Sequence, residues 1–414
     1  MYCNCGIIGI YNENKFQKNL YNFSQLLEKL QHRGRESAGI CHLQQSKLSI
    51  NKGMGLVSDI FDKDTYISQE AAVMIGHVRY STSGSEKTSS IEKKLLETQP
   101  LSNSENTFSI AHNGNIPNIK TIIKNINKDF NDFNDFSLRE NISDSQLLLA
   151  FFSYLETKFK NLKWIDRLLL LFKYFKGAYS MLIMTQTALY AVRDKYGYRP
   201  LVLGKSRKRN NWIVASETCC FDNTEYSFVR YIKPGEAIKI AKDDTSAIAT
   251  DNKLPIMQSF DLNNYKNDIS KIYKPTTSQT SQTPQTHQKC IFENIYFMKP
   301  ESIVEYDNIY TTRIKTKAKT KTKTVFDIRY MLGQILAKEE NKIEYSDNKS
   351  DYLVIGSPNT GIPGGKGYAK YFGIEYSQAL KKRADCGRTF ILPTQDKRKE
   401  YVKKFIIDYE AIKN

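Results

Sequence analysis

Residues 1–10 read MYCNCGIIGI, and the part that decides the fold is CGIIGI, which runs from Cys5 to Ile10. Its apolar residues predict a buried β-strand, and Cys5 stands directly at the start of that strand. Cys3 precedes no such run. A cysteine at a free N-terminus can use its own α-amine as a base, because the amine has a pKa of about 8. Two interpretations of Cys5 follow: a nucleophile uncovered by removal of a propeptide, residues 1–4, or a small buried residue at a strand start.

The composition is that of a folded globular protein with a basic surface. The 414 residues are enough for two or three domains, and 40% hydrophobic with 25% charged residues is ordinary. The net charge of +17 attracts anions of any kind, including phosphorylated metabolites and nucleic acid. No nucleic-acid motif or interleaving of aromatic and basic residues accompanies this charge, so we expect no specific nucleic-acid partner.

The sequence also bounds the cellular setting. No apolar stretch reaches the length of about 20 residues that a membrane helix needs, so we expect no membrane association. No secretory leader opens the chain. The seven cysteines are irregularly spaced, which favours reduced thiols over a disulfide framework. A cytoplasmic protein is therefore predicted.

Hydrophobic patterns divide the chain into a larger first part and a smaller second part. Buried strands are predicted at 5–11, 71–80, 178–184 and 188–194, and helices at 23–30 and 144–159. The second part is predicted to hold a helix at 325–340, a strand at 351–357 and the start of another helix at 366–373, the order of a parallel α/β sheet.

Two low-complexity segments separate or interrupt these parts. The polar stretch YKPTTSQTSQTPQTHQK, residues 273–289, lacks an apolar period and predicts a linker, which we place at 266–289. The stretch RIKTKAKTKTKT, residues 313–324, holds six basic residues and no acid. It predicts an exposed loop, with an anion-binding arm as the alternative.

Further motifs resemble one known family in collinear order. They are LQHRGRESAGI (30–40), GHVRYSTSG (76–84), QPL (99–101), AHNGNI (111–116), SDSQLL (143–148), GAYS (177–180), RDKYGYRPLVLG (193–204) and ASE (215–217). Together they resemble the glutamine-hydrolysing domain of class II amidotransferases, and most closely that of the amidophosphoribosyltransferase family. CIFENIYFMKPES (290–302) and GRTFILPTQDKR (387–398) resemble the second half of the same family.

The resemblance implies a fold and a division of the chain. It implies an α+β protein, in which residues 5–265 form the αββα sandwich of N-terminal nucleophile hydrolases, with two antiparallel sheets between helical layers. Residues 290–414 are expected to form a partial α/β phosphoribosyltransferase-type domain. The implied function is purine synthesis by hydrolysis of glutamine and transfer of ammonia to phosphoribosyl pyrophosphate (PRPP), which gives phosphoribosylamine.

The glutaminase chemistry needs a nucleophile and fixed donors for an oxyanion. By resemblance, Cys5 is the nucleophile, and the Asn113 side chain and the Gly114 backbone N–H form the oxyanion hole. Without the family context, an Asn-Gly pair is typical of a tight turn. LQHRG and RDKYGYRP are expected to support this site.

A free amino acid must be bound at both of its charged ends. Arg79 can take the α-carboxylate in a bidentate pair, and Thr82 can add a hydroxyl contact. Asp144 is placed to bind the α-ammonium, and it follows Ser143 in SDSQ, where Ser143 and Gln146 have capping-box spacing. Asp144 could instead, or in addition, complement the helix dipole.

The second half departs from the family pattern. The family's acidic loop after its first core strand reads here Ser357–Gly361, with Asn359 where an acid is usual. Lys382 matches a lysine of the flexible catalytic loop and is expected to bind PRPP, whereas Ala384 stands where a basic residue is common. The family's paired aspartates and Gly-Thr, which bind the ribose phosphate, are not found.

These departures bear on cofactors. Mg²⁺ is expected for the transferase reaction, and no metal ligand within the chain is predicted. Cys290 occupies a position that ligates an iron–sulfur cluster in some relatives, but such a cluster needs four thiolates. Cys219, Cys220 and Cys386 do not fall at the family's ligand positions, so a cluster is not favoured and Cys290 is expected to be buried.

Two classes of function remain open. The first is an amidophosphoribosyltransferase that binds glutamine and PRPP and forms a homo-oligomer, or a truncated relative with glutaminase activity only. The second is a non-catalytic regulatory or binding protein that keeps the fold.

Overall fold

The computed structural model describes residues 5–12, 18–44, 47–67, 69–80, 90–133, 142–242, 254–264, 290–305, 323–340, 349–383, 396, 399–400 and 405–412. The chain divides into two compact units, Met1–Lys289 and Cys290–Asn414. The proposed propeptide, the proposed linker and residues 313–322 of the predicted loop lie outside the described residues.

The first unit is built on two antiparallel sheets. The seven-stranded sheet has the order β13-β11-β12-β1-β6-β3-β4, and the six-stranded sheet has the order β15-β14-β10-β9-β8-β7. The first sheet comprises β1 (Gly6–Tyr11), β3 (Ser37–Gln44), β4 (Lys47–Met54), β6 (Val73–Arg79), β11 (Val202–Ser206), β12 (Trp212–Ala215) and β13 (Tyr226–Tyr231). The second comprises β7 (Leu101–Ser102), β8 (Phe108–Asn115), β9 (Ala178–Thr185), β10 (Ala188–Arg193), β14 (Glu236–Lys242) and β15 (Pro255–Asp261). β2 (Lys18–Asn19) pairs with β5 (Glu70–Ala71) in a separate small sheet.

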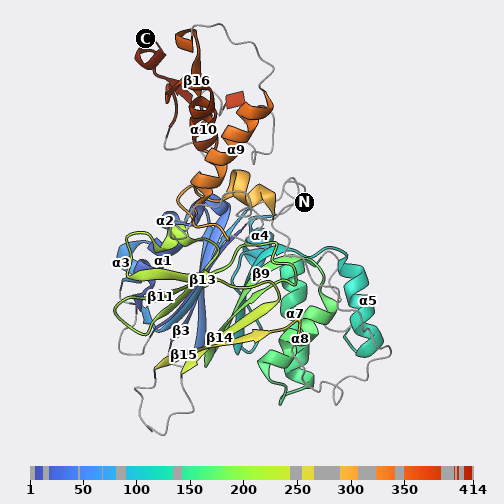
Figure 1. The fold of residues 1–414 in the computed structure, drawn as a ribbon. Helices are drawn as coiled ribbons and strands as arrows, with labels where there is room; N and C mark the ends of the chain where they lie inside the picture. The colour runs from blue at the N-terminus through green and yellow to red at the C-terminus, as the bar shows by residue number, and fades with distance from the viewer. Residues whose placement is uncertain are drawn as a thin grey trace. The chain divides into compact units, whose positions relative to one another are not determined.

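Helices cover the outer faces of the two sheets, as Figure 1 shows. The first sheet is covered by α1 (Leu20–Glu28), α2 (Val57–Ile60) and α3 (Lys63–Tyr66), and the second by α5 (Ile119–Asp129), α7 (Asp144–Lys158) and α8 (Trp164–Tyr174). A further helix, α4 (Ile91–Glu97), and the 3-10 helices η2 (Gln31–Arg33) and η3 (Thr218–Phe221) complete the unit. The predicted αββα sandwich is confirmed.

The alternation along β1 explains why this strand decides the fold. Ile8 and Ile10 pack in the core under α1, whereas Ile7 and Tyr11 pack in the core between the two sheets. β1 is buried along its whole length and pairs with β12 on one side and β6 on the other. A strand buried on both faces must be apolar throughout, and β1 meets that requirement with isoleucines and glycines.

The longest helix beside the sheets begins where the sequence predicts. Ser143 Oγ accepts from the backbone N–H of Gln146 at 3.2 Å, and Gln146 Oε1 accepts from the backbone N–H of Ser143 at 3.0 Å. This reciprocal pair confirms the capping box at the start of α7. It fixes Asp144 as the first residue of the helix.

The second unit contains a small parallel pair of strands and two helices. β16 (Leu353–Ile355) and β17 (Glu375–Ser377) pair in parallel, which confirms the predicted parallel arrangement. Its other elements are a π-helical turn (Glu293–Phe297), α9 (Val325–Glu339), η7 (Lys349–Asp351), α10 (Ile362–Phe372), β18 (Leu380–Lys382), β19 (Phe405–Ile407) and η9 (Glu410–Ile412). Thr324, the last residue of the predicted loop, is not part of a free loop: it forms a bridge with Ile303 and caps α9. Over the described residues, no helix of the chain has the length and apolar character that crossing a membrane requires.

Acid should destabilise the first unit through His42. This residue lies in β3 and is buried, and burial lowers the pKa of its imidazole from the ordinary value of 6.5. Below about pH 6.5 the unfolded chain therefore binds a proton that the folded chain does not, so stability is lost as the pH falls. We expect His42→Gln to reduce this acid sensitivity by up to about 1.4 kcal/mol per pH unit. Urea unfolding of both proteins at about pH 7.5 and pH 5.5 checks this; an identical loss in both would contradict it.

Candidate active site

Cys5 and Arg79, the arginine expected to bind substrate, lie at the same end of the seven-stranded sheet. Cys5 is buried, with 3% of its surface exposed. Its Sγ accepts a hydrogen bond from the backbone N–H of Tyr80 at 3.5 Å. Because Gly6 pairs with Val78 across β1 and β6, Cys5 falls opposite Arg79. Cys5 also continues the alternation of Ile7, so its side chain faces the space between the two sheets.

Arg79, the last residue of β6, is surrounded by carboxylates. Its Nη2 lies 2.5 Å from Oε2 of Glu97, and its Nε lies 3.2 Å from Oε2 of Glu36. Burial opposes the charge of Arg79, but Glu97, Glu36 and Cys5 together outweigh it and raise the pKa of the guanidinium. Arg79 therefore lies within electrostatic reach of the Cys5 sulfur, as expected, and is already engaged by the protein's own acids. Thr82, its expected helper, lies outside the described residues.

Asn113 lies in the other sheet and points into the space between the two sheets. It lies within β8, where Ala111 belongs to the core between the sheets and Ile110 to the core under the helices. Asn113 shares the orientation of Ala111 and so points between the sheets. Its side chain is fully buried, yet neither Oδ1 nor Nδ2 has a hydrogen-bond partner among the described residues. An unpaired buried amide costs about 1–3 kcal/mol, so its retention indicates a use other than stability.

Glycine is required at position 114 because the neighbouring strand packs too closely for a side chain, and not because the chain turns there. Asn113 and Gly114 lie inside β8 and pair with Ser180 and Tyr179 of β9, so the alternative of a tight turn is wrong. A Cβ on Gly114 would lie 2.2 Å from the carbonyl oxygen of Ala178. Only glycine allows the two strands to approach in this way.

Asp144 is hydrogen-bonded to the main chain just after β8. Its Oδ2 accepts from the backbone N–H of Ile116 at 3.1 Å, just beyond the end of β8, and its Oδ1 accepts from that of Ser145 at 2.8 Å. The carboxylate thus serves the helix terminus and lies next to the Asn113–Gly114 strand. Both interpretations of Asp144, as dipole partner and as ammonium acceptor, are compatible with this position.

A buried hydrogen-bond network joins the strand to the helix. Gln99 Oε1 accepts from the backbone N–H of His112 at 2.6 Å, and Gln99 Nε2 donates to Ser145 Oγ at 3.0 Å. The same Ser145 Oγ is hydrogen-bonded to Nδ1 of His112 at 3.0 Å. Burial lowers the pKa of His112, so its imidazole is neutral near pH 7. The network fixes the spacing between the Asn113 strand and Asp144.

Arg33 holds the main chain of Cys5. Its Nε donates to the carbonyl oxygen of Cys5 at 2.9 Å, and its Nη1 donates to Glu217 Oε1. Both charged side chains are fully buried. The adjacent Gly34 packs so closely on Arg79 that a Cβ would lie 2.4 Å from the Arg79 carbonyl carbon. Two residues of LQHRG, Arg33 and Gly34, thus contact Cys5 and Arg79, as a supporting role for the proposed site requires.

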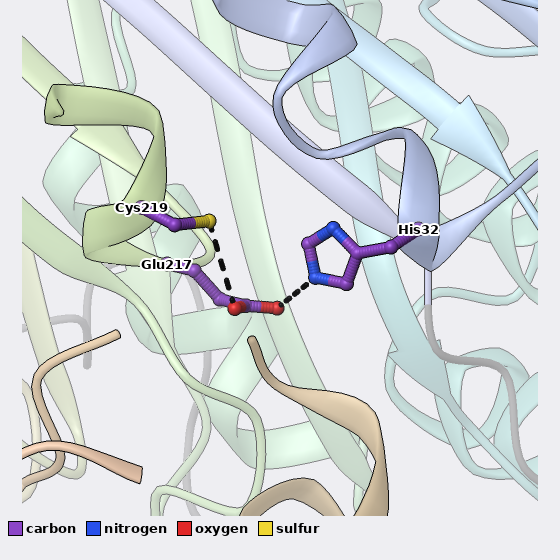
Figure 2. A group of neighbouring side chains, drawn as sticks. All are labelled: His32, Glu217 and Cys219. Atoms are coloured by element: carbon purple, nitrogen blue, oxygen red, sulfur yellow. Dashed lines mark hydrogen bonds and ion pairs between the residues drawn. The ribbon is translucent and has the colours of Figure 1, made fainter. Parts of the chain in front are cut away.

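Figure 2 shows that Glu217 has two further neighbours, His32 and Cys219. His32 Nε2 lies 2.8 Å from Glu217 Oε1, and Cys219 Sγ lies 3.7 Å from Glu217 Oε2. An imidazole, a carboxylate and a thiol are a plausible donor set for Zn²⁺. However, the Glu217 charge is already neutralised by the buried Arg33, whose own charge would repel a cation. The group therefore fits a structural role better than a metal site.

Comparison with known proteins agrees with this geometry. The family model described as a glutamine amidotransferase domain matches residues 87–223. Amidophosphoribosyltransferase of Synechococcus elongatus is 30% identical over 402 residues, covering 96% of this chain and 67% of the relative. The chloroplastic enzyme of Glycine max is 31% identical over 408 residues, covering 99% of this chain and 59% of the relative. The chain thus spans about three fifths to two thirds of these relatives.

The chain belongs to the amidophosphoribosyltransferase family. The fold agrees, since a solved glutamine PRPP amidotransferase of B. subtilis aligns with a TM-score of 0.65 and 28% identity, over 96% of this chain and 70% of that one. The family resemblance and the fold class are confirmed.

Some of the residues that were expected to bind PRPP or a cofactor lie in the described part of the second unit. Ser357–Gly361 forms the loop between β16 and α10, with Asn359 exposed. Lys382 ends β18 and is half-buried, directly before residues 384–395, which lie outside the described residues. Cys290 is half-buried, so the expectation that it is fully buried is wrong. Cys219 and Cys220 are buried in the first unit, and Cys386 lies outside the described residues.

The sequence did not reveal how the supporting residues act. QPL and ASE were recognised only as family motifs, yet Gln99 and Glu217 provide the buried contacts behind the site. Gln99 lies two residues before β7 and Glu217 lies two residues after β12, and no local pattern at either position indicates a buried polar contact. Their partners are far away in the sequence, so spacing could not identify them.

Gln99→Ala should weaken both stability and activity. The change leaves the His112 N–H and one Ser145 hydrogen bond unsatisfied in a buried setting, which should cost about 1–3 kcal/mol of unfolding free energy. It should also lower glutaminase activity, because the strand and Asp144 lose their common support. Urea unfolding and glutamate release measure the two effects. Gln258→Ala, at an exposed position of β15, is the matched control, and equal behaviour of the two variants would refute the role of the network.

The buried thiols should resist alkylation in the folded protein. Burial raises the pKa of Cys41 to about 12 and raises that of Cys220 well above its ordinary value. The thiolate is the reactive form, so both should stay unmodified at about pH 7.5. Brief iodoacetamide treatment followed by peptide mass spectrometry should modify Cys41 and Cys220 only after urea unfolding. Modification of either at the rate of an unfolded control would show that burial does not protect it.

Proposed function

We propose that this chain is a glutamine-dependent amidophosphoribosyltransferase whose first unit hydrolyses glutamine at Cys5. One observation carries the proposal: the buried amide of Asn113, which has no hydrogen-bond partner in the described part of the chain, and the thiol of Cys5 point into the same space between the two sheets. A polar donor kept unpaired beside a nucleophile is what stabilisation of an oxyanion requires.

The mechanism starts at the N-terminus. Removal of residues 1–4 converts the Cys5 peptide nitrogen into an amine, which takes the thiol proton. The sulfur attacks the side-chain amide carbon of glutamine, and the Asn113 Nδ2 and Gly114 N–H stabilise the resulting oxyanion. The amine returns the proton to the leaving nitrogen, ammonia departs and a thioester remains. Water then attacks the thioester, which releases glutamate and regenerates the thiol.

Recognition of glutamine uses its charged ends. Arg79 takes the α-carboxylate, with a hydroxyl contact from Thr82, and Asp144 takes the α-ammonium. The buried Arg33–Glu217 pair and the Gln99 network position the reacting groups without touching the substrate. Neutral His112 adds no positive charge that would compete with the ammonium for Asp144.

The second unit is proposed to receive ammonia for attack on C1 of PRPP, as pyrophosphate leaves. The loop Ser357–Gly361 and Lys382 are its proposed anion-binding groups, because the loop precedes a helix N-terminus and Lys382 adds a positive charge. Mg²⁺ would neutralise the pyrophosphate charge. The loop offers it neutral oxygens and no carboxylate, so we assign no step to the metal.

Asn359 favours a second candidate. A relative that lacks the acidic side chain in this loop could hydrolyse glutamine without transferring ammonia. Pyrophosphate release from PRPP, with glutamine or with ammonium salts, distinguishes the two functions. Release with either nitrogen source supports the transferase, and glutamate formation without pyrophosphate supports the glutaminase. We propose in addition a cytoplasmic homo-oligomer, which fractionation and light scattering would test.

Cys5→Ala should abolish glutamate release, whereas Cys3→Ala should leave it intact. Asn113→Ala should lower the rate about 10²- to 10³-fold, the scale of losing one oxyanion donor. N-terminal mass spectrometry of the active protein should find Cys5 as the first residue. Hydrolysis by protein that still carries Met1 would refute the amine as base. A processed protein that is inert would favour the non-catalytic alternative.

A further inference from the structure

The helix α4 ends beside the proposed glutamine-binding arginine. It is short, from Ile91 to Glu97, and none of its residues is buried. Ile91 and Leu96 are 73% and 66% exposed. A helix with so little buried surface is held weakly and can be displaced at small cost.

Every nitrogen of the Arg79 guanidinium has a partner in the protein. Nη2 pairs with Glu97 Oε2 at 2.5 Å, Nε pairs with Glu36 Oε2 at 3.2 Å, and Nη1 donates to the carbonyl oxygen of Lys94 at 3.3 Å. Two of these three partners, Glu97 and Lys94, belong to α4. Arg79 and Glu97 retain 21% and 23% side-chain exposure, so water reaches the pair.

A substrate α-carboxylate needs the same donors. Bidentate binding of a carboxylate uses two parallel N–H groups of one guanidinium. Glu97 and Lys94 each occupy one N–H of Nη2 and Nη1, so both terminal nitrogens are already partly engaged while α4 is in place. The Glu97 carboxylate is chemically the same ligand as the glutamine carboxylate, only tethered to the chain.

We propose that Glu97 competes with the α-carboxylate of glutamine for Arg79, so that α4 must release the arginine before substrate binds. This inference rests on the function proposed above, in which Arg79 binds glutamine. Glu36 directly precedes β3 and also pairs with Lys94 of α4, but it lies outside that helix, so its contact with Arg79 can persist when α4 leaves. Glu97 is thus a determinant of glutamine affinity rather than a catalytic residue.

Glu97→Gln tests the competition, since it removes the charge and keeps the shape. The pair is partly exposed, so KM for glutamine should fall by about 1.5- to 5-fold with kcat unchanged. Glu92→Gln is the matched control, because it removes the same charge from an exposed position of the same helix. Its KM should equal that of the unaltered protein.

Alkylation of Cys5 gives a second readout. The diazoketone analogue of glutamine carries the α-carboxylate, whereas iodoacetamide does not. Glu97→Gln should accelerate inactivation by the analogue by the same factor as the fall in KM and leave the rate with iodoacetamide unchanged. Equal acceleration by both reagents would mean that α4 only covers the thiol, and would overturn the proposal.

The possible outcomes distinguish failure of the Glu97 competition from failure of the proposed glutaminase function. If the protein hydrolyses glutamine and Glu97→Gln leaves KM unchanged or raises it, the competition is refuted and the proposed function stands. If the processed protein neither hydrolyses glutamine nor reacts with the analogue at Cys5, the proposed function fails, and the competition fails with it.

Discussion

The buried ion pair between Arg33 and Glu217 is the constraint on which the site depends. The two residues are separated by 184 positions in the sequence, and neither side chain is exposed. Removing one member of such a pair costs about 3–5 kcal/mol, because the other charge is left in a medium that cannot solvate it. The same Arg33 also donates from Nε to the Cys5 carbonyl oxygen. The position of Cys5, the proposed nucleophile, therefore depends on an ion pair whose loss would strongly destabilise the fold.

Each of the two sheets contributes different residues to the proposed site. β1 and β6 present the thiol and the arginine, and β8 presents an unpaired amide from the opposite sheet. The helix layer adds Asp144 through the N-terminus of α7, which the Gln99 network ties to β8. Buried hydrogen bonds from Arg33 and Gln99 thus hold the start of β1 and the strand β8. The contact between α4 and Arg79 is, in contrast, partly exposed.

Local patterns predicted the local structure well. The apolar alternation found β1, β6, β9 and β10, and the Ser143–Gln146 spacing found the capping box, because these features depend on neighbouring residues alone. Motif order predicted the family, and the roles of Cys5 and Asn113 that follow from it stay predictions. The sequence could not find that Glu97 occupies Arg79 or that Gln99 supports His112, since these contacts depend on how distant segments pack. The prediction that Cys290 is buried was also wrong, since this residue is only partly buried.

The alternation of β8 makes the site intolerant of misalignment. Asn113 points between the sheets while its neighbour His112 points toward α7. A slip of one residue against β9 exchanges these two faces completely, since side chains in a strand alternate with a period of two. Such a slip would place an imidazole where the amide stands and would drive the oxyanion donor into the helix layer. A molecule with this shifted register would therefore lack the proposed glutaminase activity altogether instead of showing a reduced rate. The specific activity of a preparation would then report the fraction of chains in the correct register.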